Sequence, residues 1–181
     1  MKLITTQKWT APPHLDLPLD VANPLQVIRL ATGPGYEAIT LSDGGIKNFQ
    51  PGMFASVLAE MCAAIPFLEI ETEHGREWLN PHFIAGIYDE AHGDDYALLA
   101  SGVIVKFRGQ ALDVLKRAGD TLALIPFAHQ GGSTWYLNPY FILSITSNVE
   151  GVSIYVRGWE VRVDGKLADI IAKLSAVKAA A

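Results

Sequence analysis

Short stretches of alternating apolar and polar residues recur along most of the chain, and glycine, proline or asparagine separates them. Alternation with a period of two is typical of strands that bury one face. The clearest stretch is 159–163, where we expect Val161 and Val163 to face a core if Trp159 does too, which leaves Glu160 and Arg162 facing solvent. The chain is therefore predicted to be rich in short antiparallel strands.

Three stretches change to a spacing of three and four residues, which marks one face of a helix. Their apolar positions are Phe54, Val57, Leu58 and Met61; Leu112 and Leu115; and Leu167, Ile170, Ile171 and Leu174. We expect each group to form the buried face of a short helix. Cys62 lies within the first of these stretches, and we expect its thiol to be buried and unreactive.

An Asn-Pro pair recurs three times, at spacings of 57 and 58 residues. The pairs are Asn23-Pro24, Asn80-Pro81 and Asn138-Pro139. Asparagine can cap a turn through its own backbone and proline fixes the next φ angle, so we interpret each pair as a structural turn that leads into a strand. Contact with a ligand is the alternative. Isoleucines follow at matching offsets, and we expect Ile84, Ile87, Ile142 and Ile145 to be buried.

Other features recur around each pair. A glycine follows each asparagine after about twenty residues, at Gly44, Gly102 and Gly158, and a strand-like stretch before it holds a tyrosine. We therefore predict an α+β, β-rich fold made of three diverged repeats, each a small antiparallel β unit closed by a helix, packed pseudo-symmetrically. The predicted repeats span 1–64, which includes an N-terminal strand, 65–121 and 122–181.

The third repeat carries the pattern most clearly, from Trp135 to Leu174. It has an apolar residue before Asn-Pro, two spaced isoleucines, a glycine loop, two strands around a second glycine, and a terminal helix rich in leucine and isoleucine. This pattern resembles small bacterial and phage proteins of the FlbD type and, more distantly, the β-rich units of LytTR-type DNA-binding domains. The resemblance implies a fold and, for the LytTR type, DNA contacts, from which the acidic second repeat departs. It assigns no functional residue.

Composition is that of a folded chain, since 50% of the 181 residues are apolar and 18% are charged. The net charge of −5 argues against a wholly basic nucleic-acid binder. Acidic residues concentrate in 61–120, whereas 121–181 is slightly basic and is compatible with a local site for an anionic partner. The chain shows neither a signal-peptide pattern nor an apolar run long enough to span a bilayer, so we expect a cytoplasmic protein without a membrane partner.

The sequence motifs considered do not predict catalysis, a metal site or a cofactor. The acidic loop 89–95 lacks the alternating ligand spacing of a calcium loop, and we interpret it as a solvated hairpin loop. The five histidines show no metal-ligand spacing. We therefore expect no metal, no cofactor and no enzymatic activity, although acids distant in sequence can meet in space.

The most suggestive surface lies in the third repeat. Strand alternation places Tyr155 and Arg157 on one face, and Arg162 and Lys166 follow in the next strand and just beyond it. A tyrosine with cationic neighbours can stack on bases and contact phosphates, and the same residue types are common at protein interfaces. Cross-strand packing with solvated charges is the third interpretation.

The sequence favours a non-enzymatic binding or interaction protein of bacterial or phage type, with a protein partner or self-association through the repeats. RNA or single-stranded DNA binding through Tyr155, Arg157, Arg162 and Lys166 is the first alternative. A small-molecule-binding or hydrolytic pocket between repeats is the second.

Overall fold

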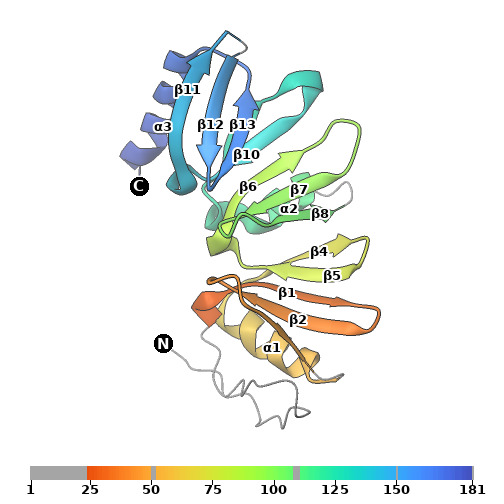
Figure 1. Ribbon diagram of the computed structural model, residues 1–181. Helices are drawn as coiled ribbons and strands as arrows, with labels where there is room; N and C mark the ends of the chain where they lie inside the picture. The colour runs from red at the N-terminus through yellow and green to blue at the C-terminus, as the bar shows by residue number, and fades with distance from the viewer. Residues whose placement is uncertain (1–23, 50–51, 108–110, 150, 181) are drawn as a thin grey trace. The chain divides into compact units, whose positions relative to one another are not determined.

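The structure is a computed structural model that describes residues 24–49, 52–107, 111–149 and 151–180 (Figure 1). The fold is α+β and rich in β-strands, with three sheets and three α-helices in the described residues. The chain forms two compact units: unit 1 comprises Met1–Glu69 and His74–Asn80, and unit 2 comprises Ile70–Glu73 and Pro81–Ala181. The N-terminal strand predicted before Asn23 lies outside the described residues. No helix of the described part combines the length and apolar character needed to cross a bilayer.

The first sheet has five strands in the order β3-β2-β1-β5-β4. A short 3-10 turn, η1 (Pro24–Gln26), leads into it. Its strands are β1 (Val27–Gly33), β2 (Tyr36–Leu41), β3 (Ile46–Asn48), β4 (Leu68–Thr72) and β5 (Gly75–Leu79). The chain order and the spatial order differ because β5 pairs with β1, the strand that follows the first Asn-Pro pair.

Helix α1 (Phe54–Ala64) packs on this sheet and confirms the first predicted helix (Figure 1). Phe54, Val57 and Met61 are buried against the apolar face of β1, β2 and β5. Cys62 follows Met61 and is exposed, so the prediction of a buried thiol is wrong. One residue advances the helix by about 100°, and this step turns Cys62 away from the sheet. Partial desolvation, and then the Glu69 carboxylate, raise the pKa of the Cys62 thiol, which disfavours the reactive thiolate.

Unit 2 contains a five-stranded sheet with the order β8-β7-β6-β10-β9 and a three-stranded sheet with the order β11-β12-β13. The larger sheet consists of β6 (Ile84–Asp89), β7 (Asp95–Leu99), β8 (Ile104–Phe107), β9 (Ile125–Ala128) and β10 (Thr134–Leu137). The smaller sheet consists of β11 (Ile142–Asn148), β12 (Gly151–Val156) and β13 (Trp159–Val163). Short 3-10 turns connect them: η2 (Pro81–Phe83), η3 (Gly119–Thr121), η4 (Gln130–Gly132) and η5 (Pro139–Phe141).

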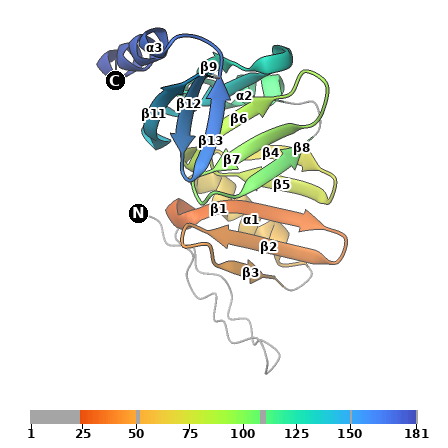
Figure 2. The same ribbon diagram turned by 45° about the horizontal axis from the view of Figure 1, so that its top comes forward.

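The two sheets of unit 2 share one core, and Figure 2 shows β13 next to β6 and β7. Ala85 and Leu98 of the larger sheet pack in the same cluster as Ile154, Val161 and Val163 of the smaller one. The predicted inward orientation of Val161 and Val163 is therefore confirmed, since both are buried. Glu160 and Arg162 alternate with them and are exposed, as predicted.

Helix α3 (Leu167–Ala180) confirms the third predicted helix. Ile170 and Leu174 are buried in the shared core of unit 2, and Leu167 is partly buried against it. Ile171 is 48% exposed, so the prediction that it belongs to the buried face is wrong.

Helix α2 (Ala111–Ala118) lies where the second helix was predicted, but it buries a different face. Ala111, Val114 and Ala118 are buried, whereas Leu112 is exposed and the predicted Leu112–Leu115 face is wrong. The Asp95 carboxylate accepts a hydrogen bond of 2.8 Å from the Ala111 N–H and so anchors the first residue of the helix. Two alanines on the buried face let the helix backbone approach the core closely, which larger side chains would prevent.

Each Asn-Pro pair leads into a 3-10 turn and then into a strand, β1, β6 or β11. The predicted capping role is confirmed at Asn138, whose Oδ1 accepts a hydrogen bond of 3.1 Å from the Tyr140 N–H. A second role was not predicted: the buried amides of Asn80 and Asn138 donate to the backbone carbonyls of Val27 and Ile84, at 2.8 and 3.2 Å. Each asparagine therefore also joins its turn to a strand that lies far earlier in the chain.

The four isoleucines that follow the second and third Asn-Pro pairs differ in burial. Ile84 and Ile87 are completely buried in β6, as predicted. Ile142 and Ile145 are only partly buried, so the prediction is wrong for these two. The reason is the position of the strand, because β6 is central in its sheet whereas β11 is at the edge of its own.

Candidate functional site: an aromatic cavity in unit 2

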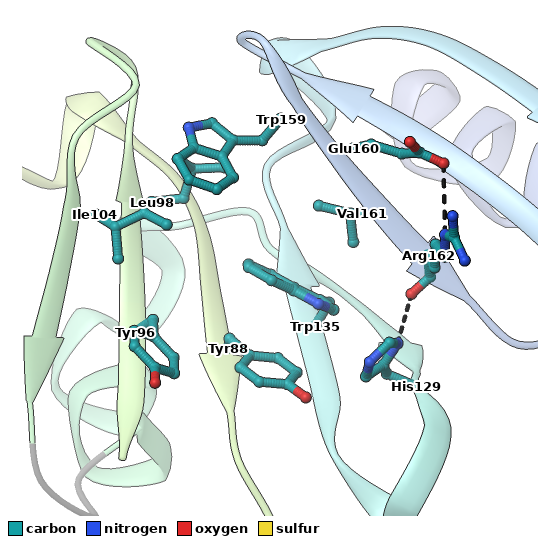
Figure 3. A pocket seen from close by; sticks show the side chains of 10 residues that line it. All are labelled: Tyr88, Tyr96, Leu98, Ile104, His129, Trp135, Trp159, Glu160, Val161 and Arg162. Atoms are coloured by element: carbon teal, nitrogen blue, oxygen red, sulfur yellow. Dashed lines mark hydrogen bonds and ion pairs between the residues drawn. The ribbon is translucent and has the colours of Figure 1, made fainter. Parts of the chain in front are cut away.

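A cavity of about 410 Å³ lies between the two sheets of unit 2 (Figure 3). One wall is a row of rings on three neighbouring strands: Tyr96 on β7, Tyr88 on β6 and Trp135 on β10. The antiparallel register places Tyr88 directly opposite both of the others. The Tyr88 ring centroid lies 6.1 Å from that of Tyr96 and 4.6 Å from that of Trp135, with interplanar angles of 27°. The wall is therefore a stacked aromatic row built by strand pairing.

A glycine on the central strand lets β10 and its side chains pack closely beside this row. A β-carbon at Gly86 would lie 2.8 Å from Cδ2 of Leu137 and 3.7 Å from Cε3 of Trp135. A side chain at this position would therefore push the Leu137 side chain away from β6 and would contact Trp135. Because Gly86 and Tyr88 are two residues apart on one strand, the space left by Gly86 lies on the same face as the aromatic row.

The opposite wall comes from β13, through Trp159 and Val161 (Figure 3). The Trp159 indole N–H donates a hydrogen bond of 3.0 Å to the carbonyl of Gly102, in the turn between β7 and β8. This bond holds the ring over the cavity, while 43% of the side chain stays exposed. Leu98 and Ile104 supply the remaining apolar surface.

Polar groups lie together at one side of the cavity. Arg162 and Glu160 form an ion pair of 3.6 Å, and Glu160 also accepts a hydrogen bond of 2.7 Å from the Ser153 hydroxyl. Nδ1 of His129 lies 2.7 Å from the backbone carbonyl of Arg162. A carbonyl oxygen can only accept, so Nδ1 carries a proton, and in the neutral ring Nε2 is an acceptor. The cavity thus has an apolar body and a polar margin.

The Tyr88 hydroxyl is a hydrogen-bond donor in this setting. Burial is the main cause that raises the pKa of the Tyr88 phenol. The hydrogen bond with Ser133 lowers this pKa, and the hydrogen bond with Glu90 raises it. The net effect is an increase, so the phenol keeps its proton well above neutral pH. The ring edge of His129 approaches the Tyr88 ring with 5.7 Å between centroids.

The acidic loop beside this site has structural partners. Asp95 accepts hydrogen bonds from the N–H groups of Glu90 and Ala111, and Glu90 accepts one of 2.9 Å from the Ser133 hydroxyl. Asp94 forms an ion pair of 2.6 Å with Lys106. In the described part of the chain, no three histidine, cysteine or acidic side chains are grouped as a metal site would require.

Two of the residues predicted for binding share one face of the smaller sheet. Tyr155 is partly exposed on β12, directly opposite Glu160 on β13, and Ser153 is opposite Arg162. The Arg162 side chain also borders the cavity. The structure therefore brings Tyr155 and Arg162 to the same face, but it places the Glu160 carboxylate beside them.

The other two residues predicted for binding, Arg157 and Lys166, lie away from this face. Arg157 occupies the β12–β13 turn with φ of 47°, and its guanidinium carbon lies 5.4 Å from the ring centroid of Phe141. Lys166 is exposed just before α3, where its carbonyl accepts the N–H of Ile170 at 3.2 Å. Arg157 and Arg162 lie at opposite ends of the β12–β13 hairpin, so the four residues do not form one compact cationic site.

Sequence reasoning missed Tyr88, Trp135 and His129. Tyr88 and Trp135 do lie near the second and third Asn-Pro pairs, which the sequence analysis singled out. Their contact follows only once β10 is known to pair with β6, in the register that sets Trp135 opposite Tyr88. Comparison with protein-family models, curated proteins and solved structures found no match to this chain. The resemblance to FlbD-type and LytTR-type proteins therefore stays a prediction.

Proposed function

We propose that the protein is a non-enzymatic binding protein that takes a flat, largely apolar small molecule into the cavity of unit 2. The observation that carries this proposal is the stacked row of Tyr96, Tyr88 and Trp135, which faces Trp159 across the cavity. Aromatic walls favour offset-stacked or edge-to-face packing with a planar group, and they lose little side-chain entropy when they bind.

The size and polarity of the cavity support the same proposal. Its volume of about 410 Å³ is within the range of small-molecule sites, about 300–1,000 Å³. The hydrogen-bonding groups of His129, Arg162 and Tyr88 are at its margin, which suits a ligand with one polar end. The described residues that line it are mainly aromatic and aliphatic, and they include no serine, threonine, cysteine or lysine.

We also infer that the chain consists of three diverged repeats. The order of 3-10 turn, three strands and α-helix follows each of the three Asn-Pro pairs. Gly44, Gly102 and Gly158 each lie between the second and third strands of a repeat, with φ angles of 86°, 85° and 87°. Such agreement in backbone geometry at equivalent positions supports a common ancestral unit.

A fluorescent probe tests the ligand proposal. We choose 8-anilinonaphthalene-1-sulfonate, which has a planar naphthalene ring and one anionic end, and we expect saturable binding of one dye per chain. Ile104→Trp should weaken binding because the larger indole takes up part of the cavity, and Tyr96→Ala should weaken it about two- to tenfold through lost aromatic contact.

The matched control is Leu112→Trp, which makes the same kind of change at an exposed position of α2, away from the cavity. It should bind the dye as the wild type does. Unsaturable binding to the wild type, or equal affinity of the Ile104→Trp and Leu112→Trp proteins, would refute the proposal.

A further inference from the structure

The strand after the third Asn-Pro pair lies at the edge of its sheet, whereas its two counterparts are central. Strand β1 pairs with both β2 and β5, and β6 pairs with both β7 and β10. In the three-stranded sheet, β11 pairs with β12, and within the described residues no strand pairs with its outer edge (Figure 1). A strand edge of this kind can bind an extended peptide through backbone hydrogen bonds.

The outer edge of β11 has the same backbone shape as the two filled edges. Each of the three strands shows a register shift at its second residue, which is Ile28, Ala85 or Leu143. In β1 and β6 the carbonyl of this residue accepts a hydrogen bond of 2.9 Å from the N–H of the asparagine that ends the partner strand, Asn80 or Asn138. The Leu143 carbonyl is the matching acceptor in β11.

Burial at this residue follows the same division. Ile28 is 1% exposed and Ala85 is 0% exposed, but Leu143 is 66% exposed. A leucine that is exposed on a strand edge leaves apolar surface in water. A strand added beside β11 would cover the position that is buried in the other two sheets.

Strand β11 lacks the residues that discourage strand addition at the other edges. A charged residue or a proline occurs in each of the other five edge strands of the described chain: Lys47 in β3, Glu69 and Glu71 in β4, Lys106 in β8, Pro126 in β9, and Glu160 and Arg162 in β13. Such residues protect an edge from pairing with another chain. Strand β11 contains neither a charge nor a proline, so its edge suits an uncharged, apolar partner strand.

The two filled edges show which residues such a strand contains. Each is occupied by an aromatic residue, a leucine and an asparagine in succession, Trp78-Leu79-Asn80 or Tyr136-Leu137-Asn138, and proline follows. The leucine is 0% exposed in both. The aromatic residue lies opposite a fully buried aliphatic residue, Leu30 or Ile87. Ile145 holds this position in β11 and is only partly buried, so it is available for the same cross-strand pair.

The asparagine side chain adds a second contact. In both filled edges its amide donates to the carbonyl of the first residue of the strand, Val27 at 2.8 Å or Ile84 at 3.2 Å. The corresponding carbonyl in β11 belongs to Ile142, next to Leu143. An asparagine at the end of an added strand can therefore donate twice, from its side chain and from its backbone.

We propose that the outer edge of β11 binds an extended segment of another protein that carries the sequence aromatic-Leu-Asn-Pro. The segment runs antiparallel to β11 in the register of the filled edges, with its leucine opposite Ser144 and its aromatic residue opposite Ile145. Serine is intermediate in size between Arg29 and Gly86, which lie opposite the leucine in those edges. Both such segments of the described chain are already paired within their own sheets, so another protein supplies the partner strand. This inference rests on the repeats proposed above and is independent of the cavity.

A synthetic peptide tests the proposal. Residues 133–139, with fluorescein at the N-terminus and an amide at the C-terminus, contain the proposed sequence, and the terminal amide replaces the Tyr140 N–H that Asn138 accepts in the chain. Fluorescence anisotropy with the full-length protein should show saturable one-to-one binding with a Kd below about 1 mM. Asn138→Ala in the peptide should weaken binding about two- to tenfold, because the side-chain donor is lost.

Methylation of single backbone nitrogens distinguishes strand pairing from nonspecific apolar binding. N-methylation of Asn138 in the peptide removes the donor to Leu143 and should weaken binding at least about tenfold. N-methylation of Leu137 should change the affinity less than about twofold, because alternate residues direct their N–H groups away from β11. Equal losses for the two methylated peptides would contradict strand pairing.

Variants of the protein locate the binding edge. Leu143→Asp places a charge on the edge and should weaken peptide binding at least about tenfold, whereas Leu112→Asp, at another exposed leucine, should bind as the wild type does. Absence of saturable binding up to about 1 mM, or equal affinity of these two variants, would overturn the proposal.

Two further measurements separate this proposal from its neighbours. If the wild type sediments as a dimer and Leu143→Asp as a monomer, a second copy fills the edge and the proposed partner is wrong. Dye binding to the cavity should be unchanged in Leu143→Asp, so failure of peptide binding and failure of the ligand proposal are distinguishable.

Disulfide trapping tests the register. The protein carries Ser144→Cys or Thr146→Cys in a Cys62→Ser background, and both positions are exposed in the wild type. The peptide with Leu137→Cys should form a disulfide severalfold faster with the cysteine at position 144, since facing residues of a non-hydrogen-bonded pair lie about 4.5 Å apart. The peptide with Trp135→Cys should prefer position 146. Equal yields in all four combinations, or the opposite preference, would refute the register.

Discussion

The amide of Asn138 offers a sharp test of how the turn is joined to the preceding strand. Its Nδ2 donates to the carbonyl of Ile84 at 3.2 Å, and its Oδ1 accepts from the N–H of Tyr140 at 3.1 Å. The side chain is 9% exposed, so water replaces neither bond easily. Asn138→Ala loses both, and at about 0.5–1.5 kcal/mol each it should lower the free energy of unfolding by about 1–3 kcal/mol.

Asn138→Asp separates the two roles. The carboxylate can still accept from Tyr140, but it cannot donate to Ile84 and instead directs negative charge at that carbonyl. At pH 7 we expect a loss of about 3 kcal/mol, since a buried charged group without its partner costs more than a neutral one. Repulsion should raise the pKa of the new carboxyl above its unfolded value of about 3.9. Below that value the protonated group can donate to Ile84, so most of the loss should disappear.

The sign of the pH effect follows from linkage. Stability relative to the wild type should be highest below about pH 4 and should fall as pH rises through the raised folded-state pKa. Urea unfolding of both proteins at pH 4 and pH 7 measures this change. Asn48→Asp, at an exposed site in β3, should cost under about 0.5 kcal/mol and serves as the control. An Asn138→Asp protein as stable as the wild type at pH 7 would refute the donor role.

Three further outcomes are expected. Ile87→Ala should lower the free energy of unfolding by about 2–5 kcal/mol and Ile145→Ala by less than about 2 kcal/mol, because only Ile87 is fully buried; equal losses in urea would contradict this difference. Because the pKa of Tyr88 is raised above 10.0, the wild type should lose stability as pH rises from about 10 through the raised value, and an equal loss in Tyr88→Phe would argue against the assignment. If the third repeat binds RNA, replacing Arg157 and Arg162 with serine should weaken binding to every sequence and reduce the salt dependence by roughly one log–log unit per lost contact; unchanged gel shifts would exclude these contacts.

Local sequence signals determined where the chain turns and where its helices form. Gly44, Gly102 and Gly158 mark turns because a positive φ is costly for a residue with a β-carbon, whatever lies around it. The three-four spacing of Phe54, Val57 and Met61 likewise predicted α1, since the periodicity belongs to the helix itself. These features depend on neighbouring residues and can be inferred from sequence.

Tertiary structure decided which strands pair and which faces are covered. The cavity exists because β10 pairs with β6 in a register that stacks Trp135 on Tyr88, two residues that the sequence places far apart. Leu112 is exposed because α2 turns Ala111 toward the core, and Ile145 is half-buried because its strand lacks an outer neighbour in the described part of the chain. The alternation of apolar and polar residues shows that a strand has one buried and one exposed face, but it does not show which strand lies beside it. The pairing energy comes from contacts between residues distant in sequence, and only the folded chain brings them together.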